Sequence, residues 1–208
     1  MISSETLNDY LARLASRQPT PGGGAAAALH AAQGAALVAM VARYTTGEKY
    51  AQHEELITRI TGTADHLITE ALRLADADEQ AFQGVIDSYK LPSGTEELKA
   101  ARAAGIQGAL VNAARTPAQL IQLAGEVVEL ATELFDVANP NVISDVAAAA
   151  DAARAAATTA RVNIDINLVA IKDGDARSRL AEQTNGLEDK VVLAADSLAA
   201  RVRERILA

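Results

Sequence analysis

The chain has 208 residues, half of them hydrophobic, which is long enough for one domain with a substantial core. It contains no cysteine, so disulfide frameworks, thiolate metal sites and thiol nucleophiles are excluded. A net charge of −8 with scattered basic residues argues against a general nucleic-acid-binding protein. The longest apolar block, residues 25–42, is mostly alanine and carries too little transfer energy to predict a membrane span. We therefore expect one cytoplasmic domain over residues 1–208, with no nucleic-acid or membrane partner.

Apolar residues recur at helical spacing along the whole chain, aromatic residues make up only 3%, and no segment alternates with period two. The pattern predicts an all-α fold, a single-domain bundle of about six to seven helices with long, alanine-rich central helices. The predicted helices cover about residues 3–16, 24–46, 50–89, 95–115, 117–138, 142–172 and 176–207. Small residues on several helix faces have to be covered, which predicts a homodimer or a larger homo-oligomer.

The stretch PTPGGG, Pro19 to Gly24, starts the predicted helix 24–46. Prolines and glycines do not continue a helix, whereas the alanines that follow are among the best helix formers. Glycines at a helix start leave backbone N–H groups open to close approach, so either a ligand or a neighbouring helix takes up the space beside them. No strand precedes the glycines and no Lys-Ser/Thr pair follows, which excludes a phosphate loop or a dinucleotide-binding turn.

One acid interrupts the apolar face of the predicted helix 50–89. That face has steps of three or four residues and consists of Ile60, Ala64, Leu67, Ala71, Leu74, Asp78, Phe82, Val85 and Tyr89. A carboxylate at this position must pair, accept hydrogen bonds or have a raised pKa, and a raised pKa suits proton transfer near neutrality. The structural alternative is an interhelical salt bridge or a cap on a neighbouring helix. Asp76 lies on the nearly opposite, polar side and must have a different role.

The predicted helix 142–172 carries two polar pairs. Ser144 and Asp145 lie at its start, where helix capping is the expected structural role. Asn163 and Asn167 are four residues apart and share one helical face. Two amides on one face either bind the donors and acceptors of a heterocycle or bridge helices. The spacing of the histidines does not match a metal site, so no metal is predicted.

Five short segments occur in a recognisable order: PTPGGG at 19–24, DADEQAF at 76–82, YKLP at 89–92, NPNVISD at 139–145 and VNIDINL at 162–168. In this order they resemble the formiminotransferase-cyclodeaminase C-terminal domain family, which also contains stand-alone methenyltetrahydrofolate cyclohydrolases. The resemblance implies an all-helical, dimeric or larger protein that binds a tetrahydrofolate one-carbon adduct as substrate and needs no further cofactor. The chain departs from the usual pattern at Ala25, where the family usually has serine, and at Ala138, where it often has glycine.

The resemblance implies an enzyme and leaves two activities open. One is hydrolysis of methenyltetrahydrofolate to formyltetrahydrofolate. The other is the cyclodeaminase reaction, which closes formiminotetrahydrofolate to methenyltetrahydrofolate and releases ammonia. This sequence lacks the formiminotransferase domain that accompanies the second activity in bifunctional members, which favours the cyclohydrolase. A non-catalytic helical protein that binds folate or another partner is the third alternative.

Both reactions need one acid/base group near a cation, and Asp78 is the first candidate, with Asp76 second. The resemblance implies that the glycine turn admits the flat pterin or the benzoyl-glutamate and that the two asparagines bind polar edges of the substrate. Two basic residues are candidates for the glutamate carboxylates. The complete set of predicted substrate-binding residues is Gly22, Gly23, Gly24, Lys90, Arg102, Ser144, Asp145, Asn163 and Asn167.

Overall fold

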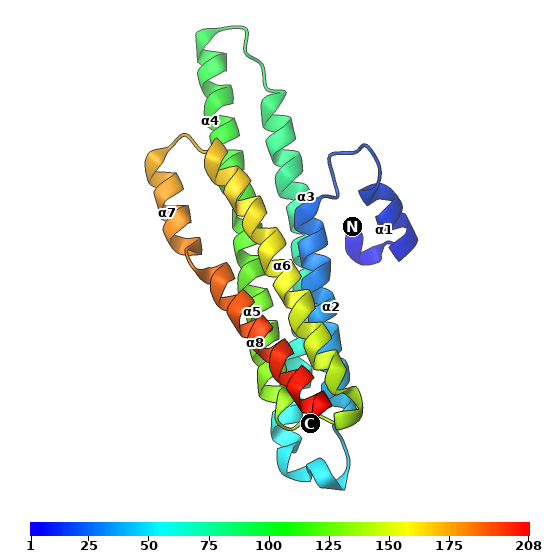
Figure 1. Ribbon diagram of the computed structural model, residues 1–208. Helices are drawn as coiled ribbons and strands as arrows, with labels where there is room; N and C mark the ends of the chain where they lie inside the picture. Colours follow the sequence, from blue (N-terminus) through cyan, green and yellow to red (C-terminus); the bar gives the residue numbers. More distant parts are fainter.

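The computed structural model describes residues 1–208 and contains helices but no strands. Long helices run up and down an elongated bundle (Figure 1). The α-helices are α1 (Leu7–Leu14), α2 (Gly23–Tyr44), α3 (Glu54–Tyr89), α4 (Glu96–Ala113), α5 (Arg115–Phe135), α6 (Ile143–Ala170), α7 (Gly174–Thr184) and α8 (Leu187–Leu207). Three short 3₁₀ helices complete the fold: η1 (Ile2–Ser4), η2 (Glu48–His53) and η3 (Pro140–Val142). The predicted all-α bundle is confirmed.

Helix α2 lies at the centre of the bundle and packs against α3, α5 and α6. Its small residues allow the helices to approach closely. A Cβ atom added to Gly34 would lie 3.1 Å from the carbonyl oxygen of Ala149 and 3.2 Å from Cγ1 of Val127. A larger residue at this position would therefore push α2 away from α5 and α6. The predicted close packing of alanine-rich helices is confirmed.

The same helix is long and apolar enough to cross a membrane by length and composition. Its most apolar 18-residue window has a mean hydropathy of 1.6, and 61% of that window is buried inside the bundle. Contacts with α3, α5 and α6 thus account for most of its apolar surface. The expectation that α2 does not span a membrane stays a prediction.

The structure differs from the predicted helices at both ends of the chain. The predicted helix 3–16 is divided into η1 and α1, because the Thr6 side chain caps α1 by accepting a hydrogen bond from the backbone N–H of Asp9. The predicted helix 176–207 is divided into α7 and α8 at Gly186, whose φ is 68°. Glycine adopts this left-handed conformation without penalty and ends helices readily. Apolar periodicity alone gave no sign of either break.

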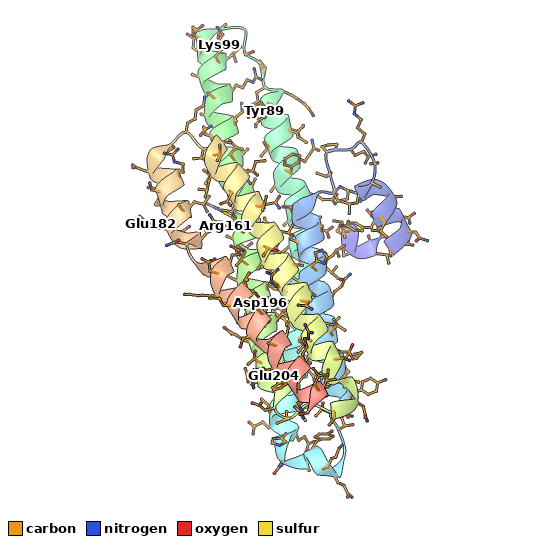
Figure 2. All side chains as sticks on the ribbon, viewed as in Figure 1. Tyr89, Lys99, Arg161, Glu182, Asp196 and Glu204 are labelled. Atoms are coloured by element: carbon orange, nitrogen blue, oxygen red, sulfur yellow. The ribbon has the colours of Figure 1, made fainter.

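Two parts of the molecule project from the bundle (Figure 1). Helix α1 lies to one side, next to the level where α2 begins, and the hairpin of α3 and α4 extends past the other helices. Figure 2 labels Tyr89 and Lys99 at the tip of this hairpin. Tyr89 is 51% exposed, and Leu91 and Leu98 are also exposed. In Figure 1 the start of α2 lies beside α1 and below the tip of the α3–α4 hairpin. Several elements of the fold meet there.

Candidate active site

A cavity of about 210 Å³ lies at the N-terminal end of α2. Four parts of the chain line it: residues 19–24, one turn of α3, the junction of α4 and α5, and the C-terminal part of α6. Asp78 is the only charged side chain in the lining. A larger groove of about 810 Å³ between α5 and α8 contains none of the predicted site residues. The smaller cavity is therefore the candidate active site.

Asp78 reaches the cavity from the apolar face of α3. The positions that precede it on this face, from Ile60 to Leu74, are buried, whereas Phe82 after it is 45% exposed. Asp78 thus lies where the buried face opens into the cavity. Burial raises the pKa of the Asp78 carboxyl to about 6; the backbone N–H of Ala25 lowers it and the negative charge of Glu79 raises it further. This carboxyl group exchanges its proton close to neutral pH, as a general acid or base must.

The same carboxylate lies against the first turn of a neighbouring helix, α2. The residue before α2, Gly22, has no side chain that can accept a hydrogen bond from the first turn. Asp78 instead faces the backbone N–H of Ala25 within that turn. A negative charge at a helix N-terminus is favourable. Asp78 therefore lies at the N-terminus of α2, as the structural alternative of a cap requires, and also lines the cavity. Its role in proton transfer stays a prediction.

The glycine turn gives Asp78 the room to reach α2. A Cβ atom added to Gly24 would lie 2.1 Å from Oδ1 of Asp78, which is closer than atoms can approach. A Cβ atom on Gly23 would lie 3.2 Å from Nδ2 of Asn163, and one on Gly22 would meet nothing within 4 Å. The sequence predicted that either a ligand or a neighbouring helix fills the space beside these glycines. At Gly24 that space is filled by a side chain of the neighbouring helix α3. Gly22 and Gly23 remain open to the cavity.

Asn163 and Asn167 both line the cavity from α6. The side-chain NH₂ group of Asn163 donates to the carbonyl oxygen of Thr159, and that of Asn167 donates to the carbonyl oxygen of Asn163, each over 2.8 Å. These hydrogen bonds within α6 give the NH₂ group of each amide a partner and fix the orientation of the amide. The two amide oxygens remain as acceptors for a ligand with N–H groups.

Asp76 is not part of the cavity. Its Oδ1 accepts a hydrogen bond of 2.6 Å from the backbone N–H of Ile2, and its Oδ2 accepts one of 3.1 Å from the hydroxyl of Ser3. The polar side of α3 therefore binds the N-terminal segment of the chain. The structure supports the prediction that Asp76 and Asp78 have different roles, and it does not bring Asp76 to the position of an acid/base group.

Ser144 and Asp145 lie in the first turn of α6, about 28 Å along the helix axis from Asn163. The structure does not bring them to the cavity within this chain. The predicted capping role of their side chains is also wrong, because α6 begins at Ile143 after the 3₁₀ helix η3 and no side chain caps it. The negative charge of Asp145 still lies in the first turn, where it favours the helix.

Lys90 and Arg102 lie on the α3–α4 hairpin, outside the cavity lining. Lys90 follows the end of α3, and its Nζ is 2.9 Å from a carboxylate oxygen of Asp87. Arg102 is on α4, about 16 Å along the helix from the cavity residue Ala113, and its Nε is buried without a hydrogen-bond partner. Both cations are too distant for the reacting end of a ligand in the cavity, so only an extended ligand reaches them.

Several lining residues were not predicted as site residues from the sequence. They are Pro19, Thr20, Phe82, Ala113, Pro117 and Ile166. Phe82 carried a detectable signal, because it is one of few aromatic residues in the chain and follows Asp78 by one helical turn. The others carry no chemical signal, since a proline or an alanine becomes a cavity wall only through the packing of its helix against another.

The sequence of residues 6–186 matches the family described as Formiminotransferase-cyclodeaminase. The matched region contains every residue that lines the cavity. The chain belongs to the formiminotransferase-cyclodeaminase family. The resemblance drawn from five short segments is thereby confirmed.

Three relatives of this formiminotransferase-cyclodeaminase chain are informative. A methenyltetrahydrofolate cyclohydrolase from Methylorubrum extorquens is 39% identical over 184 residues, which is 88% of each chain. The formimidoyltransferase-cyclodeaminase of Sus scrofa is 32% identical over 200 residues, which is 94% of this chain and 37% of the pig protein. The crystal structure of a formiminotetrahydrofolate cyclodeaminase from Thermotoga maritima superposes with a TM-score of 0.88, at 28% identity and with both chains fully covered. The chain is thus similar in sequence to enzymes of both types and in fold to a cyclodeaminase.

Proposed function

We propose that this protein hydrolyses methenyltetrahydrofolate to formyltetrahydrofolate, with Asp78 as the acid/base group. The observation that carries the proposal is the cavity at the start of α2, in which the only charged group is a carboxyl with a pKa of about 6. The 39% identity to a cyclohydrolase over 88% of both chains supports this choice of reaction.

The chemistry of the substrate suits one carboxylate. Methenyltetrahydrofolate carries an amidinium cation, and an ionised Asp78 stabilises it electrostatically. Water adds to the bridging carbon while Asp78 removes one of its protons. The carbon–nitrogen bond to one of the two nitrogens then breaks, and that nitrogen takes a proton. Of the two protons of water, one ends on the released nitrogen and one goes to solvent. The proposed reaction steps use water and Asp78 and no metal cofactor.

The second candidate is the cyclodeaminase reaction, which the likeness to the Thermotoga maritima enzyme favours at a TM-score of 0.88. There the free N–H nitrogen attacks the formimino carbon and loses its proton. The departing =NH nitrogen gains two protons, one of them from the attacking nitrogen and one from the acid, and leaves as ammonia. The same cavity and the same acid/base group serve this reaction. The two reactions differ in the nucleophile and the leaving group, so the substrate distinguishes them.

In the proposed complex, the reacting end of the folate enters the cavity and the rest lies outside, because about 210 Å³ is less than a drug-sized ligand requires. The amide oxygens of Asn163 and Asn167 accept hydrogen bonds from N–H groups of the pterin, and the ring of Phe82 packs on its flat face. Lys90 and Arg102 are then the candidates for the glutamate carboxylates, including those of a polyglutamate tail.

We also propose that the protein forms a homodimer or a larger homo-oligomer through α6. Val162, Ile166 and Val169 follow one another at helical spacing and are 66%, 69% and 85% exposed. Ile166 also lines the cavity, so a second copy on this row would cover one edge of the site. Apolar side chains exposed in a row are typical of an interface between copies.

The activity is tested by two assays on the purified protein. The first follows the near-ultraviolet absorbance of methenyltetrahydrofolate, which falls as hydrolysis proceeds, with and without a chelator. The second supplies formiminotetrahydrofolate and measures ammonia. Loss of absorbance without ammonia release in the second assay supports the cyclohydrolase, and ammonia release supports the cyclodeaminase. Binding of both compounds without turnover would contradict an enzymatic role.

The assembly is tested by sedimentation at micromolar concentration. We expect a dimer or larger species for the parent and a shift toward monomer for Val162→Glu, because a buried charge without a partner opposes association. Leu7→Glu is the matched control, since Leu7 is also 66% exposed but lies on α1. A monomeric parent would contradict the proposal.

A further inference from the structure

One turn of α3 binds the beginning of the N-terminal arm, which we define as residues 1–21, and lines the cavity together with the end of that arm. At the beginning of the arm, Asp76 accepts hydrogen bonds from the backbone of Ile2 and the hydroxyl of Ser3. At the end of the arm, Pro19 and Thr20 form part of the cavity wall. The geometry of that wall therefore depends on how the arm is attached to α3.

An ion-pair cluster makes the second attachment of the arm. The guanidinium group of Arg13, on α1, pairs with Glu79 of α3 and with Glu5 of the arm. Glu79 is only 15% exposed, so its pair with Arg13 is poorly screened by solvent. Tyr10, also on α1, is 4% exposed and packs into the hydrophobic core. The ion pair therefore attaches α1 to α3 at the residue that follows Asp78 in the sequence.

Glu79 is adjacent in sequence to Asp78, and it is the side-chain charge that acts on Asp78. It raises the pKa of Asp78, after burial as the main cause. The other elements around Asp78 bring no further charge to the cavity: α2 presents the backbone N–H of Ala25, α6 presents two neutral amides, and the α4–α5 junction presents apolar residues. Arg13 of α1 is the cation that pairs with Glu79, and Glu5 shares it.

We propose that Arg13 is a positioning residue for Asp78: it offsets the charge of Glu79 beside Asp78 and holds the cavity wall formed by the end of the arm. This inference rests on the proposed role of Asp78 as the acid/base group. Arg13 does not touch the cavity and acts through Glu79 and through the arm.

The two partners of this ion pair predict shifts of opposite sign. Arg13→Gln leaves Glu79 as an unpaired negative charge, which favours the protonated form of Asp78 and moves its titration to higher pH. Glu79→Gln removes the negative charge and moves the titration to lower pH. We expect each shift to be about half a pH unit or more. A purely structural pair would give both variants the same defect, because each loses the same contact.

The experiment measures the titration of Asp78 by ¹³C NMR of aspartate-labelled protein, with the Asp78→Asn variant to assign the signal. The pH dependence of kcat/KM is recorded on the same proteins. Arg13→Lys should restore a titration close to that of the parent, and the double variant Arg13→Gln with Glu79→Gln should lie between the two single variants. Arg59→Gln is the matched control: it breaks an Arg–Glu pair between α3 and α5, about 28 Å along α3 from Asp78.

Opposite shifts for Arg13→Gln and Glu79→Gln, with none for Arg59→Gln, support the inference. Shifts in the same direction, or no shift in either, overturn it. If Arg13→Gln does not fold, the double variant decides the question: loss of Arg13 from Glu79→Gln should move the titration of Asp78 back toward higher pH, and the absence of that shift overturns the inference. The NMR titration needs no substrate, so it can succeed or fail independently of turnover, and a protein inactive on both folates would contradict the proposed function without touching this result.

Discussion

The two ends of α2 are held by two different motifs of the chain. At its N-terminal end, the backbone N–H of Ala25 faces the carboxylate of Asp78. At its C-terminal end, the carbonyl oxygen of Tyr44 accepts a 2.8 Å hydrogen bond from the side-chain NH₂ of Asn139, and the hydroxyl of Thr45 accepts one of 3.1 Å from the backbone N–H of Asn139. An acceptor thus faces the backbone donors at the N-terminal end, and a donor binds the last carbonyl at the C-terminal end.

The difference between the ends lies in what surrounds the matched groups. At the N-terminal end, glycines leave space and the cavity forms; at the C-terminal end, the segment 139–145 turns directly into η3 and α6. Both segments belong to the set that resembles the family, yet within this chain only one of them reaches the cavity. An ordered set of motifs therefore identifies a family without saying which motifs meet in one site.

The sharpest test of the N-terminal end is Asp78→Asn. The amide keeps the shape of the side chain but neither transfers a proton nor carries a charge beside the cationic substrate, so turnover should fall by about a hundredfold or more. The measurement is kcat at saturating folate, together with a circular dichroism spectrum. Normal turnover, or a loss explained entirely by unfolding, would make Asp78 a structural cap and nothing more.

The same variant should become more stable relative to the parent as the pH rises. The carboxyl pKa is about 6 in the folded protein and 3.8 as its ordinary value, so the folded state binds more protons between these values. Stability from this group is therefore lost as the pH rises from about 4 to 6. Above that range the buried carboxylate costs roughly 2–3 kcal/mol, which Asp78→Asn avoids. Urea unfolding of both proteins at pH 4.5 and 7.5 measures this, and a difference that does not grow with pH would refute it.

Activity should respond to substitution of Gly24 and not of a glycine outside the cavity, Gly84. Gly24→Ala places a Cβ atom against the Asp78 carboxylate and displaces it, so we expect a loss of about tenfold or more in kcat/KM with the fold retained. Gly84→Ala, on α3 but outside the cavity lining, meets nothing within 4 Å and should change kcat/KM by less than about twofold. Equal effects of the two substitutions would show that the carboxylate does not depend on this space.

The C-terminal end should show the smallest effects on activity. Asn139→Ala removes the hydrogen bond to Tyr44 and should cost about 1 kcal/mol of stability while leaving turnover unchanged. Ser144→Ala and Asp145→Asn should change turnover by less than about twofold if the two ends act independently. A large loss of turnover in the folded Ser144 or Asp145 variants would instead indicate that a second copy brings this end of α6 to the cavity.

The fold and the central acid were accessible from the sequence because both follow from local periodicity. An acid on the apolar face of a helix is visible at Asp78 without knowing what α3 packs against, and the glycines before α2 are visible as a helix start. The break at Gly186 was missed because apolar spacing continues across it, and only the positive φ reveals it.

The cavity walls were not accessible in this way. Pro19 and Pro117 are about a hundred residues apart, and no spacing rule predicts that they share a cavity. Asp76 is a similar case, because its partners Ile2 and Ser3 come from the far end of the chain. Ser144 and Asp145 entered the predicted site through a resemblance, which orders residues along the chain but does not place them in space.

The cavity is assembled from four segments that lie between Pro19 and Asn167 in the chain, and none of them forms a wall without the others. The unfolded chain therefore has no site for the ligand. Because the ligand binds only the folded protein, its binding raises the free energy of unfolding. At a free ligand concentration of 100 times Kd, this linkage amounts to about 2.7 kcal/mol. The melting temperature of the protein should consequently rank candidate folates by affinity before any turnover is measured, and the inactive Asp78→Asn variant should serve for the same comparison without consuming them.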